Sequence, residues 1–392
     1  MTTSIEPRQR WVGVGTSTDG DSTRAGIDAA TAALRGDDAR LLIVFASDSH
    51  DLNALLAGIN KTTGGVPLIG CSTAGEIWTD GPEDASVVVT ALGGDGFAVS
   101  TTSAAGVSDD QRGAGAAVAA AVADLDDRPH RVLLLLTDGL AGGQEDVVRG
   151  AYGVLGASVP LVGGCAGDDL KMRQTFQFHN DKVLTNAAVG AALGSDAPFG
   201  IGVQHGWRKV GEPMTVTNSA NSRVYSFDDE PALDVYLRRL DAPPEAHTDP
   251  AAFTRFAVTH PLGLRRRNGE EMRFVQDADF SDRSLGCIAD VPRGGLTWIM
   301  EGDEESVLRA TESSCMDALA SLNGLPPRGL IAFDCVARRG VLGNDGIRSE
   351  IQRVARQAGG APVAGFYTYG EIARTRGTGG FHNQTLVVLA VS

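Results

Sequence analysis

The stretch VPLIGCSTAGEI, residues 66–77, begins as a short apolar run and passes at once into glycine, small polar residues and a carboxylate. Two further stretches follow the same plan: VPLVGGCAGDDL from residue 159 and APVAGFYTYGEI from residue 361. An apolar run that ends in glycine predicts a buried strand followed by a tight loop. Three such stretches in one chain predict a repeated structural unit.

The neighbours of the three stretches are also alike. Each is preceded by an apolar run, ARLLIVFAS from residue 39, HRVLLLLTDG from residue 130 or RGLIAFDC from residue 328, with helix-compatible sequence between the two. Continuous apolar runs of this kind are typical of strands buried on both faces of a sheet. The sequence therefore predicts an α/β protein with mixed β-sheets flanked by helices, built from internally repeated strand, helix, strand and glycine-loop units.

The pattern changes between the second and third copies. Residues 210–230, VGEPMTVTNSANSRVYSFDDE, alternate like hairpin strands, and residues 256–301 are typical of short strands joined by Asn-Gly and Gly-Gly turns. A chain of 392 residues favours two domains. We place their boundary near His205, which gives domains at 9–205 and 206–392.

Composition narrows the class of protein. A net charge of -15 disfavours nucleic acid and anionic membranes as partners, and no apolar run is long enough to span a bilayer. Five scattered cysteines without CxxC spacing form neither a disulfide framework nor a zinc site. The N-terminus lacks the apolar core of a secretion signal, so we expect a cytoplasmic protein.

The order of these motifs resembles that of the FIST domain proteins, a prokaryotic sensory family with N-terminal and C-terminal halves. The resemblance is carried by the glycine stretches, by RVYSFDDEPALDVYLRRL from residue 223, by HPLG at 260–263 and above all by the ending from residue 360. It implies a non-enzymatic module that binds a small ligand, such as an amino acid or related metabolite, between its halves. The two halves fill the sequence, so we expect a separately encoded output partner such as a histidine kinase, a chemoreceptor or a cyclic-dinucleotide enzyme.

The glycine loops are the first candidate ligand site. Backbone amides at the end of such a strand can approach a ligand closely, and a following acid can hold an ammonium group. The candidates from the three loops are Gly70, Cys71, Ser72, Gly75 and Glu76, then Gly164, Cys165 and Asp168, then Glu371. We expect the three acids to line one rim. The alternative is that the glycines only permit tight turns and the acids cap helices.

The tripeptide Phe-His-Asn occurs twice, as His179-Asn180 and as His382-Asn383 with their preceding phenylalanines. One interpretation is a repeated polar anchor that ties a strand to a glycine loop. The other is ligand contact, or axial ligation of a non-covalent haem b through an imidazole nitrogen, because some relatives are described as haem-binding nitric oxide sensors. No other metal site is predicted, and no cofactor is required.

Three further features remain open. GGCAG around Cys165 has the spacing of a nucleophile elbow, which makes a cysteine hydrolase, with Asp228 and His260 or His382 as nominal partners, the lower alternative. Tyr367 and Tyr369 beside Glu371 form a candidate wall for a cationic ligand. Arg273, in a strand-like alternation, is a candidate clamp for a ligand carboxylate.

Overall fold

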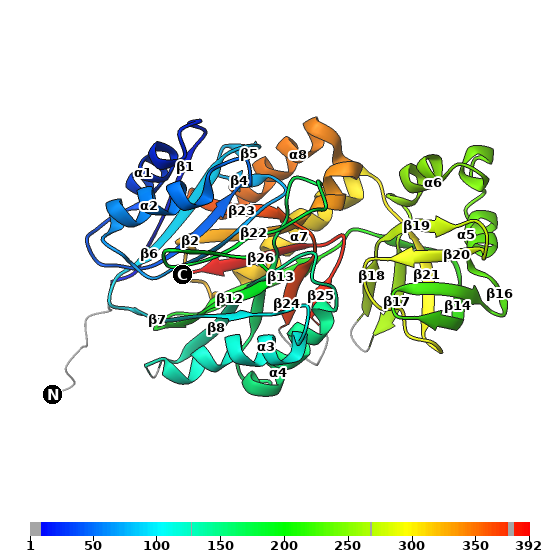
Figure 1. The fold of residues 1–392 in the computed structure, drawn as a ribbon, viewed down its shortest axis with the longest axis horizontal. Helices are drawn as coiled ribbons and strands as arrows, with labels where there is room; N and C mark the ends of the chain where they lie inside the picture. The colour runs from blue at the N-terminus through cyan, green and yellow to red at the C-terminus, as the bar shows by residue number, and fades with distance from the viewer. Residues whose placement is uncertain (1–8, 127, 267–268, 375–379) are drawn as a thin grey trace.

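The computed structural model describes residues 9–126, 128–266, 269–374 and 380–392. It has two parts, a large body and a smaller module to one side of it (Figure 1). The body consists of three sheets covered by helices, which confirms the predicted α/β class of mixed sheets. Among the described residues, no helix combines the length and the apolar character that a bilayer crossing requires.

The body contains three units, here named unit 1, unit 2 and unit 3 in chain order. Unit 1 comprises β1 (Trp11–Ser17), α1 (Ser22–Ala33), β2 (Ala39–Ala46), α2 (Leu52–Thr63), β3 (Leu68–Ser72), β4 (Glu76–Trp78), β5 (Gly81–Glu83) and β6 (Val87–Gly93). Unit 2 comprises β7 (Phe97–Ala105), α3 (Gln111–Ala119), the 3-10 turn η1 (Ala120–Asp124), β8 (His130–Thr137), α4 (Gln144–Leu155), β9 (Leu161–Cys165), β10 (Gln177–His179), β11 (Lys182–Leu184) and β12 (Ala187–Ser195).

Unit 3 carries the module as an insertion after its first strand. Its own elements are β13 (Phe199–Gln204), α7 (Glu304–Ala320), β22 (Gly329–Cys335), α8 (Val336–Ala358), β23 (Val363–Thr368), β24 (Glu371–Arg374), β25 (Phe381–His382) and β26 (Leu386–Val391). The module comprises β14 (Arg208–Ala220), β15 (Arg223–Phe227), β16 (Glu230–Pro231), α5 (Ala232–Arg239), the 3-10 turn η2 (Pro244–His247), α6 (Pro250–Ala257), β17 (Leu262–Arg266), β18 (Gly269–Arg273), β19 (Val275–Asp279), β20 (Ser284–Cys287) and β21 (Leu296–Glu301).

The three body sheets share one strand order. In each, two parallel strands joined by a helix (β2 and β3, β8 and β9, β22 and β23) lie beside an antiparallel strand (β6, β12 or β26). The edge beyond that strand is β1, β7 or β13. The observed order of strands is thus the same three times, while an origin by duplication stays a prediction.

Each short hairpin belongs to one unit by sequence but pairs with the sheet of another unit. Hairpin β4–β5 of unit 1 pairs with β23 of unit 3, β10–β11 of unit 2 pairs with β3 of unit 1, and β24–β25 of unit 3 pairs with β9 of unit 2. Each unit therefore completes the sheet of another. The sheet of unit 3 combines strands from both sides of the boundary that we placed near residue 205.

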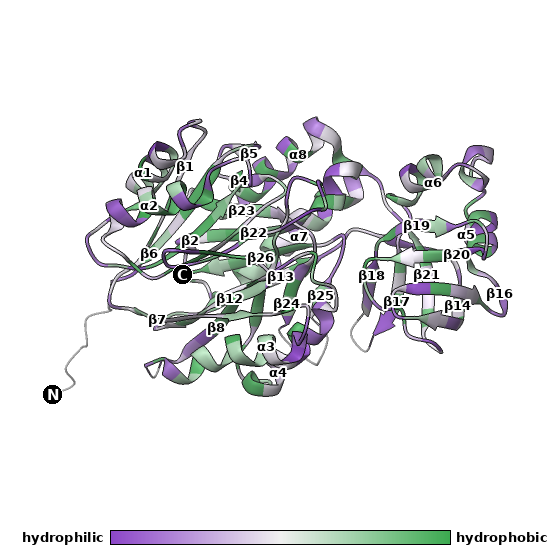
Figure 2. Cartoon of the chain, in the orientation of Figure 1, coloured by the Kyte–Doolittle hydropathy of each residue, from purple (hydrophilic) through white to green (hydrophobic). Residues whose placement is uncertain are grey.

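The core of the body lies between the three sheets. Phe45, Phe333 and Phe366 meet there, with ring centroids 4.5 Å apart for Phe45 and Phe366 and 5.9 Å for Phe333 and Phe366. Figure 2 shows many of the central strands as hydrophobic and much of the outer loops as hydrophilic, with residues of both kinds along the helices. Local signals fix the covering helices; α2, for example, follows the N-cap Asp51 and ends at Gly64 with a left-handed backbone.

Candidate functional site

The three glycine loops form a closed ring of backbone hydrogen bonds. The Gly167 amide donates to the Ser72 carbonyl (2.9 Å) and the Ala74 amide to the Tyr367 carbonyl (3.0 Å). The Tyr369 amide donates to the Cys165 carbonyl (3.2 Å) and completes the ring. Stretches 66–77, 159–170 and 361–372 are thus brought together in space, each bonded to the next.

Close packing and backbone conformation explain the glycines of this ring. A Cβ on Gly167 would lie 2.8 Å from the Ala74 nitrogen, and one on Gly70 would lie 2.2 Å from the Val44 oxygen. A Cβ on Gly164 would lie 2.7 Å from the Thr368 side chain. Gly75 has a φ of 114°, which L side chains rarely adopt. These four positions let strands and loops pack against one another, and their contribution to ligand binding stays a prediction.

Glu76 and Glu371 do not line a rim, contrary to our expectation, because both side chains are fully buried. Glu76 accepts hydrogen bonds from the Thr73 hydroxyl and from the amide and hydroxyl of Ser86. Burial raises the pKa of Glu76 to about 8 against the opposing effect of these donors. It also raises the pKa of Glu371 to about 7, with Thr368 and Thr385 opposing.

Gln177, rather than Asp168, holds the corresponding position in unit 2. Gln177 begins β10 opposite Cys71, as Glu76 begins β4 opposite Phe366 and Glu371 begins β24 opposite Gly164. Its carboxamide oxygen accepts from the Ala187 amide at 3.2 Å. The sequence comparison missed this equivalence because the connection from glycine loop to hairpin is longer in unit 2.

Asp168 instead organises that longer connection. Its carboxylate accepts hydrogen bonds from the Tyr369 hydroxyl and from the amides of Met172 (3.0 Å), Arg173 (2.6 Å) and Gln174 (3.0 Å). Although burial acts in the other direction, these donors lower the pKa of Asp168. Tyr369 is therefore a tie between unit 3 and the loop of unit 2.

The predicted thiols, the predicted serine and Tyr367 are internal. Cys71 and Cys165 are buried, and burial raises the pKa of both thiols well above the usual value, which disfavours the thiolate that a nucleophilic elbow needs. The Ser72 hydroxyl donates to the Gly167 carbonyl at 2.6 Å. Tyr367 is fully buried, with the Arg339 guanidinium 4.7 Å from its ring centroid.

The two Phe-His-Asn tripeptides are not equivalent in the fold. His179 lies in β10, the first strand of its hairpin, and His382 in β25, the second. Asn180 acts as the predicted anchor, because its side-chain oxygen accepts from the Leu68 amide at 3.1 Å. Asn383 is buried, and its side-chain oxygen has no hydrogen-bond partner in the described part.

Neither histidine has the surroundings of an axial haem ligand. Nε2 of His179 is hydrogen-bonded to the Thr101 hydroxyl (3.3 Å) and Nε2 of His382 to the Ala373 carbonyl (3.0 Å). Burial lowers the pKa of both imidazoles. Neither side chain lines the cavity described next, so the residues present do not fit the haem interpretation.

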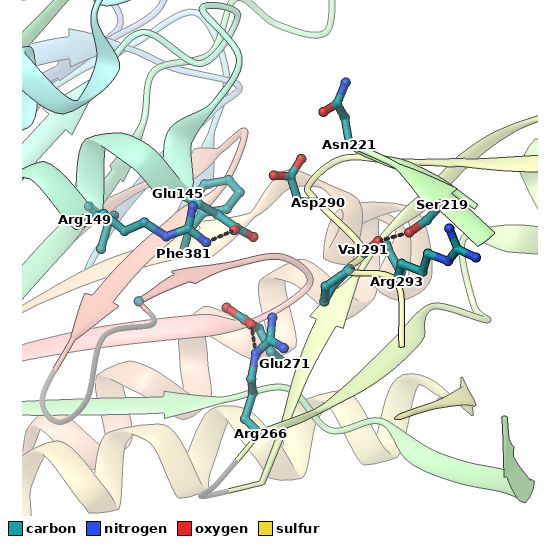
Figure 3. Close-up of a pocket in the computed structure, with 13 residues that line it drawn as sticks. Glu145, Arg149, Ser219, Asn221, Arg266, Glu271, Asp290, Val291, Arg293 and Phe381 are labelled. Atoms are coloured by element: carbon teal, nitrogen blue, oxygen red, sulfur yellow. Dashed lines mark hydrogen bonds and ion pairs between the residues drawn. The ribbon is translucent and has the colours of Figure 1, made fainter. Parts of the chain in front are cut away.

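A cavity of about 510 Å³ lies between the module and the body (Figure 3). The body contributes Glu145, Val148 and Arg149 from α4 together with Phe381 from β25. The module contributes strand residues of β14, β17 and β18 and the segment 290–293. The two module loops at its mouth are joined, because the Val291 amide donates to the Asn221 carbonyl at 3.0 Å.

Arg273 pairs with two residues that line this cavity and joins the module to the body. Its fully buried guanidinium pairs with Glu145 of α4 and, at 3.4 Å, with Glu271. It also donates to the carbonyls of Asp290 (2.9 Å) and Met272 (3.0 Å). The guanidinium of Arg273 is thus bonded to protein groups of both the module and the body, and it holds the two together. Direct contact of Arg273 with a ligand carboxylate stays a prediction.

The carboxylates of the cavity differ in their electrostatics. Although burial favours the neutral form, Arg273 and Arg266 lower the pKa of Glu271. Burial raises the pKa of Glu145 in spite of Arg273. Asn221, Asp290 and Arg293 are exposed and lack side-chain hydrogen bonds or ion pairs in the described part, so these three are free to contact a ligand.

Most residues that line the cavity carry no functional motif in the sequence. Two of the predicted residues are adjacent to it: Arg273 pairs with Glu145 and Glu271, and His382 follows the lining residue Phe381 in β25. Asn221 and Asp290 lie in turn-like stretches, SANSR and DVPRGG, whose proximity depends on how the module folds. The glycine-loop residues, by contrast, are inside the body, so the predicted set does not form one site.

Comparisons with known proteins identify two family models and several proteins that are similar to this chain. The model of the FIST N domain matches residues 40–230 and that of the FIST C domain residues 232–374. An uncharacterized protein of Mycobacterium tuberculosis is 26% identical over 385 residues, which cover 95% of this chain and 97% of that protein. An uncharacterized protein of Methanocaldococcus jannaschii is 25% identical over 162 residues, 39% of this chain but 31% of its own length.

One solved structure is a distant match. A cyanuric acid hydrolase from A. caulinodans shares 12% identity, with 47% of this chain and 71% of that chain covered and a TM-score of 0.30. A score this low supports no conclusion about the present chain.

Proposed function

The chain belongs to the FIST family, whose domains are sensory domains suggested to bind small ligands in signal transduction, and we propose that it binds its ligand in the cavity between module and body. The observation that carries the proposal is the group of three exposed, unpartnered polar side chains, Asn221, Asp290 and Arg293, at the edge of that cavity. Binding pockets commonly combine an apolar wall with a few converging polar groups. Here Val148 and Phe381 supply that wall.

The free groups indicate the charge of the ligand. Asp290 can pair with an ammonium group, and Arg293 can hold a carboxylate or another acidic group, while Asn221 can donate or accept a hydrogen bond. A ligand that carries both charges satisfies all three. A zwitterion such as an amino acid or a related metabolite is therefore the preferred ligand class.

The position of the cavity supports a mechanism by population shift. Its walls come from both the module and α4 of the body, so a ligand that contacts both walls favours the arrangement in which they are close. The ion pair between Arg273 and Glu145 links the same two walls. Ligand binding would then change the surface that module and body together present to a partner.

The output is proposed to pass to a separately encoded signalling protein, such as a histidine kinase, a chemoreceptor or a cyclic-dinucleotide enzyme, in the cytoplasm. The chain itself is proposed to act by binding, without catalysis. The buried, high-pKa thiol of Cys165 supports this choice over the hydrolase alternative.

A thermal-shift screen against amino acids and related metabolites tests the proposal, with native mass spectrometry of the purified protein for a retained ligand. We expect one zwitterion to raise the melting temperature of the wild type, and the shift to be lost in Asp290→Asn and in Arg293→Ala. Arg255→Ala, an exposed arginine of α6 in the same module, should keep the shift. No shift with any compound and no retained ligand, or a shift that persists in both cavity variants, would contradict the proposal.

A further inference from the structure

The module is joined to the body by two short linkers, residues 205–207 before β14 and residues 302–303 after β21. The first linker contacts the body, and the second linker packs against the first. The Trp207 indole donates to the Gln384 carbonyl at 3.1 Å, and a Cβ on Gly302 would lie 2.4 Å from the Trp207 ring. Any movement of the module relative to the body must involve these two segments.

Arg338 is a body side chain that contacts both the first linker and the helix that follows the second linker. It is fully buried in the first turns of α8. Nη1 donates to the carbonyl of His205, at the start of the first linker, and Nη2 to the carbonyl of Val307, in the first turn of α7 beyond the second, each at 3.5 Å. One guanidinium therefore contacts the first linker directly and the second through the first turn of α7.

Two buried carboxylates hold this guanidinium. Asp334 at the end of β22 pairs with Nε at 2.8 Å, and Glu350, further along α8, pairs with Nη2. Thr311 of α7 donates to the Glu350 carboxylate at 2.6 Å and accepts from Arg338 at 2.9 Å. The cluster of Asp334, Arg338, Glu350 and Thr311 thus connects β22, α7 and α8 to the linkers.

Stability alone does not account for this cluster. All three charged side chains are fully buried. Oδ2 of Asp334 and Oε2 of Glu350, which do not take part in the ion pairs with Arg338, have no hydrogen-bond partner in the described part. Burial of ionic groups carries a desolvation penalty that their attraction often fails to recover. Burial raises the pKa of Asp334 well above its ordinary value, and nearby Glu350 adds to that effect.

The other two units show that the fold does not require an acid here. In the parallel ladders, Asp334 is opposite Tyr367, whereas the corresponding pairs are Ala46 with Ser72 in unit 1 and Thr137 with Cys165 in unit 2. Only unit 3 has the module inserted between its first strand and its first helix. Of the three units, the one with the buried carboxylate at this position is therefore also the one that carries the module.

We infer that Asp334, Arg338 and Glu350 form the joint that couples the position of the module to helices α7 and α8 of the body. The inference rests on the proposed function only in that a ligand would move the module. In the joint, a change in the path of the first linker displaces the His205 carbonyl, and a change in the second displaces the start of α7 with the Val307 carbonyl. The ion pairs of Arg338 pass these displacements to α8.

Hydrogen exchange of the full chain, without ligand, tests the joint. The triple variant Asp334→Asn/Arg338→Met/Glu350→Gln removes every charge of the cluster at similar volume, so no buried charge is left without its partner. We expect amides of residues 203–208 and 302–307 to exchange at least ten-fold faster. Amides of β2, β8 and the module strand β20 should be unchanged. The conservative variant Glu350→Gln should give a smaller increase in the same segments.

The matched control is Arg374→Met. Arg374 is also a buried arginine, but it donates to the Val159 carbonyl at 2.7 Å and lies against Tyr152, away from the linkers. Unchanged linker exchange in the triple variant or in Glu350→Gln would overturn the inference. So would an equal increase in Arg374→Met. No ligand is used in this experiment, so a negative ligand screen does not contradict the joint. Unchanged exchange in the variants, in turn, does not contradict ligand binding in the cavity.

Discussion

Glu76 and Glu371 are equivalent residues on exchanged hairpins: each begins a strand that pairs with the sheet of another unit, and each is fully buried. Each accepts a hydroxyl hydrogen bond from the threonine three residues before it. Each also accepts from an amide and a hydroxyl just before the next long strand, at Ser86 or at Thr385. In unit 2 the equivalent residue is Gln177, so an uncharged amide is compatible with this position.

This equivalence predicts how stability depends on pH. The pKa of Glu76 is raised from 4.5 to about 8, so the folded state holds this proton more tightly than the unfolded state. The contribution of Glu76 is therefore complete below pH 4.5 and is lost as the pH rises toward 8. For Glu371 the loss is complete near pH 7.

Glu76→Gln should thus become more stable relative to the wild type as the pH rises from 5 to 8, by roughly 1 kcal/mol per pH unit in the free energy of unfolding. Urea denaturation at several pH values measures it. Glu83→Gln, at an exposed position of the same hairpin, is the control and should show no such trend. A stability difference between wild type and Glu76→Gln that is constant with pH would contradict the burial of a protonated carboxyl.

The ring of glycine loops predicts a strong position dependence for glycine substitutions. In Gly167→Ala the new methyl group meets the backbone of residues 73 and 74 at 2.8–2.9 Å, and backbone atoms cannot move aside as side chains do. We expect a loss of about 1–3 kcal/mol in the free energy of unfolding. Gly153→Ala, in α4 with nothing within 4 Å of the new atom, should gain up to about 1 kcal/mol. Similar values for the two variants would mean that the ring is not tightly packed.

The attachment of module to body predicts an unequal response to two glutamate variants. Glu145→Gln removes the charge that pairs with the fully buried Arg273, so we expect a loss of about 1–3 kcal/mol in urea denaturation. Glu305→Gln breaks a 3.4 Å pair with Arg353 in which the glutamate side chain is 59% exposed. That change should stay within about 0.5 kcal/mol. If Glu145→Gln is equally mild, Arg273 does not depend on α4.

The tie between Tyr369 and Asp168 predicts a local effect in the loop of unit 2. This loop holds Asp169, Leu170 and Met172 at positive φ values of 52°, 60° and 52°, which are uncommon for such residues. Tyr369→Phe removes the hydroxyl that bonds the Asp168 carboxylate and the Leu170 amide. Amides of residues 170–174 should exchange faster, with a loss of about 1 kcal/mol in global stability.

The control for that loop is Tyr152→Phe. It keeps the ring on which Arg374 lies, 4.7 Å from its centroid, and should leave exchange in the loop unchanged. Loop exchange that is the same in Tyr369→Phe and in the wild type would show that the backbone amides bonded to Asp168 suffice to hold the loop.

Much of the fold was predictable because its signals are local. The apolar runs before and within the glycine stretches are strands. In each unit the run before the stretch pairs in parallel with the run that begins it, as in buried α/β sheets. The hairpin exchange was not predictable, since β4 is adjacent in sequence to β3 yet pairs with β23, nearly 300 residues away. Sequence spacing also misaligned Asp168 with the two glutamates, because the extra loop residues in unit 2 move the equivalent position to Gln177.

By itself, the sequence determined the class of fold, the three glycine stretches and the need for glycine within them, since these depend on apolar burial and backbone conformation in short segments. It also carried the motif order by which the family is identified. Only the tertiary structure decided what those segments do: it placed Glu76 and Glu371 inside the body, and it formed a cavity from α4 and from module loops that have no motif in common. Burial and charge at a site depend on which elements pack together, and that information is not contained in the spacing of residues along one strand or helix.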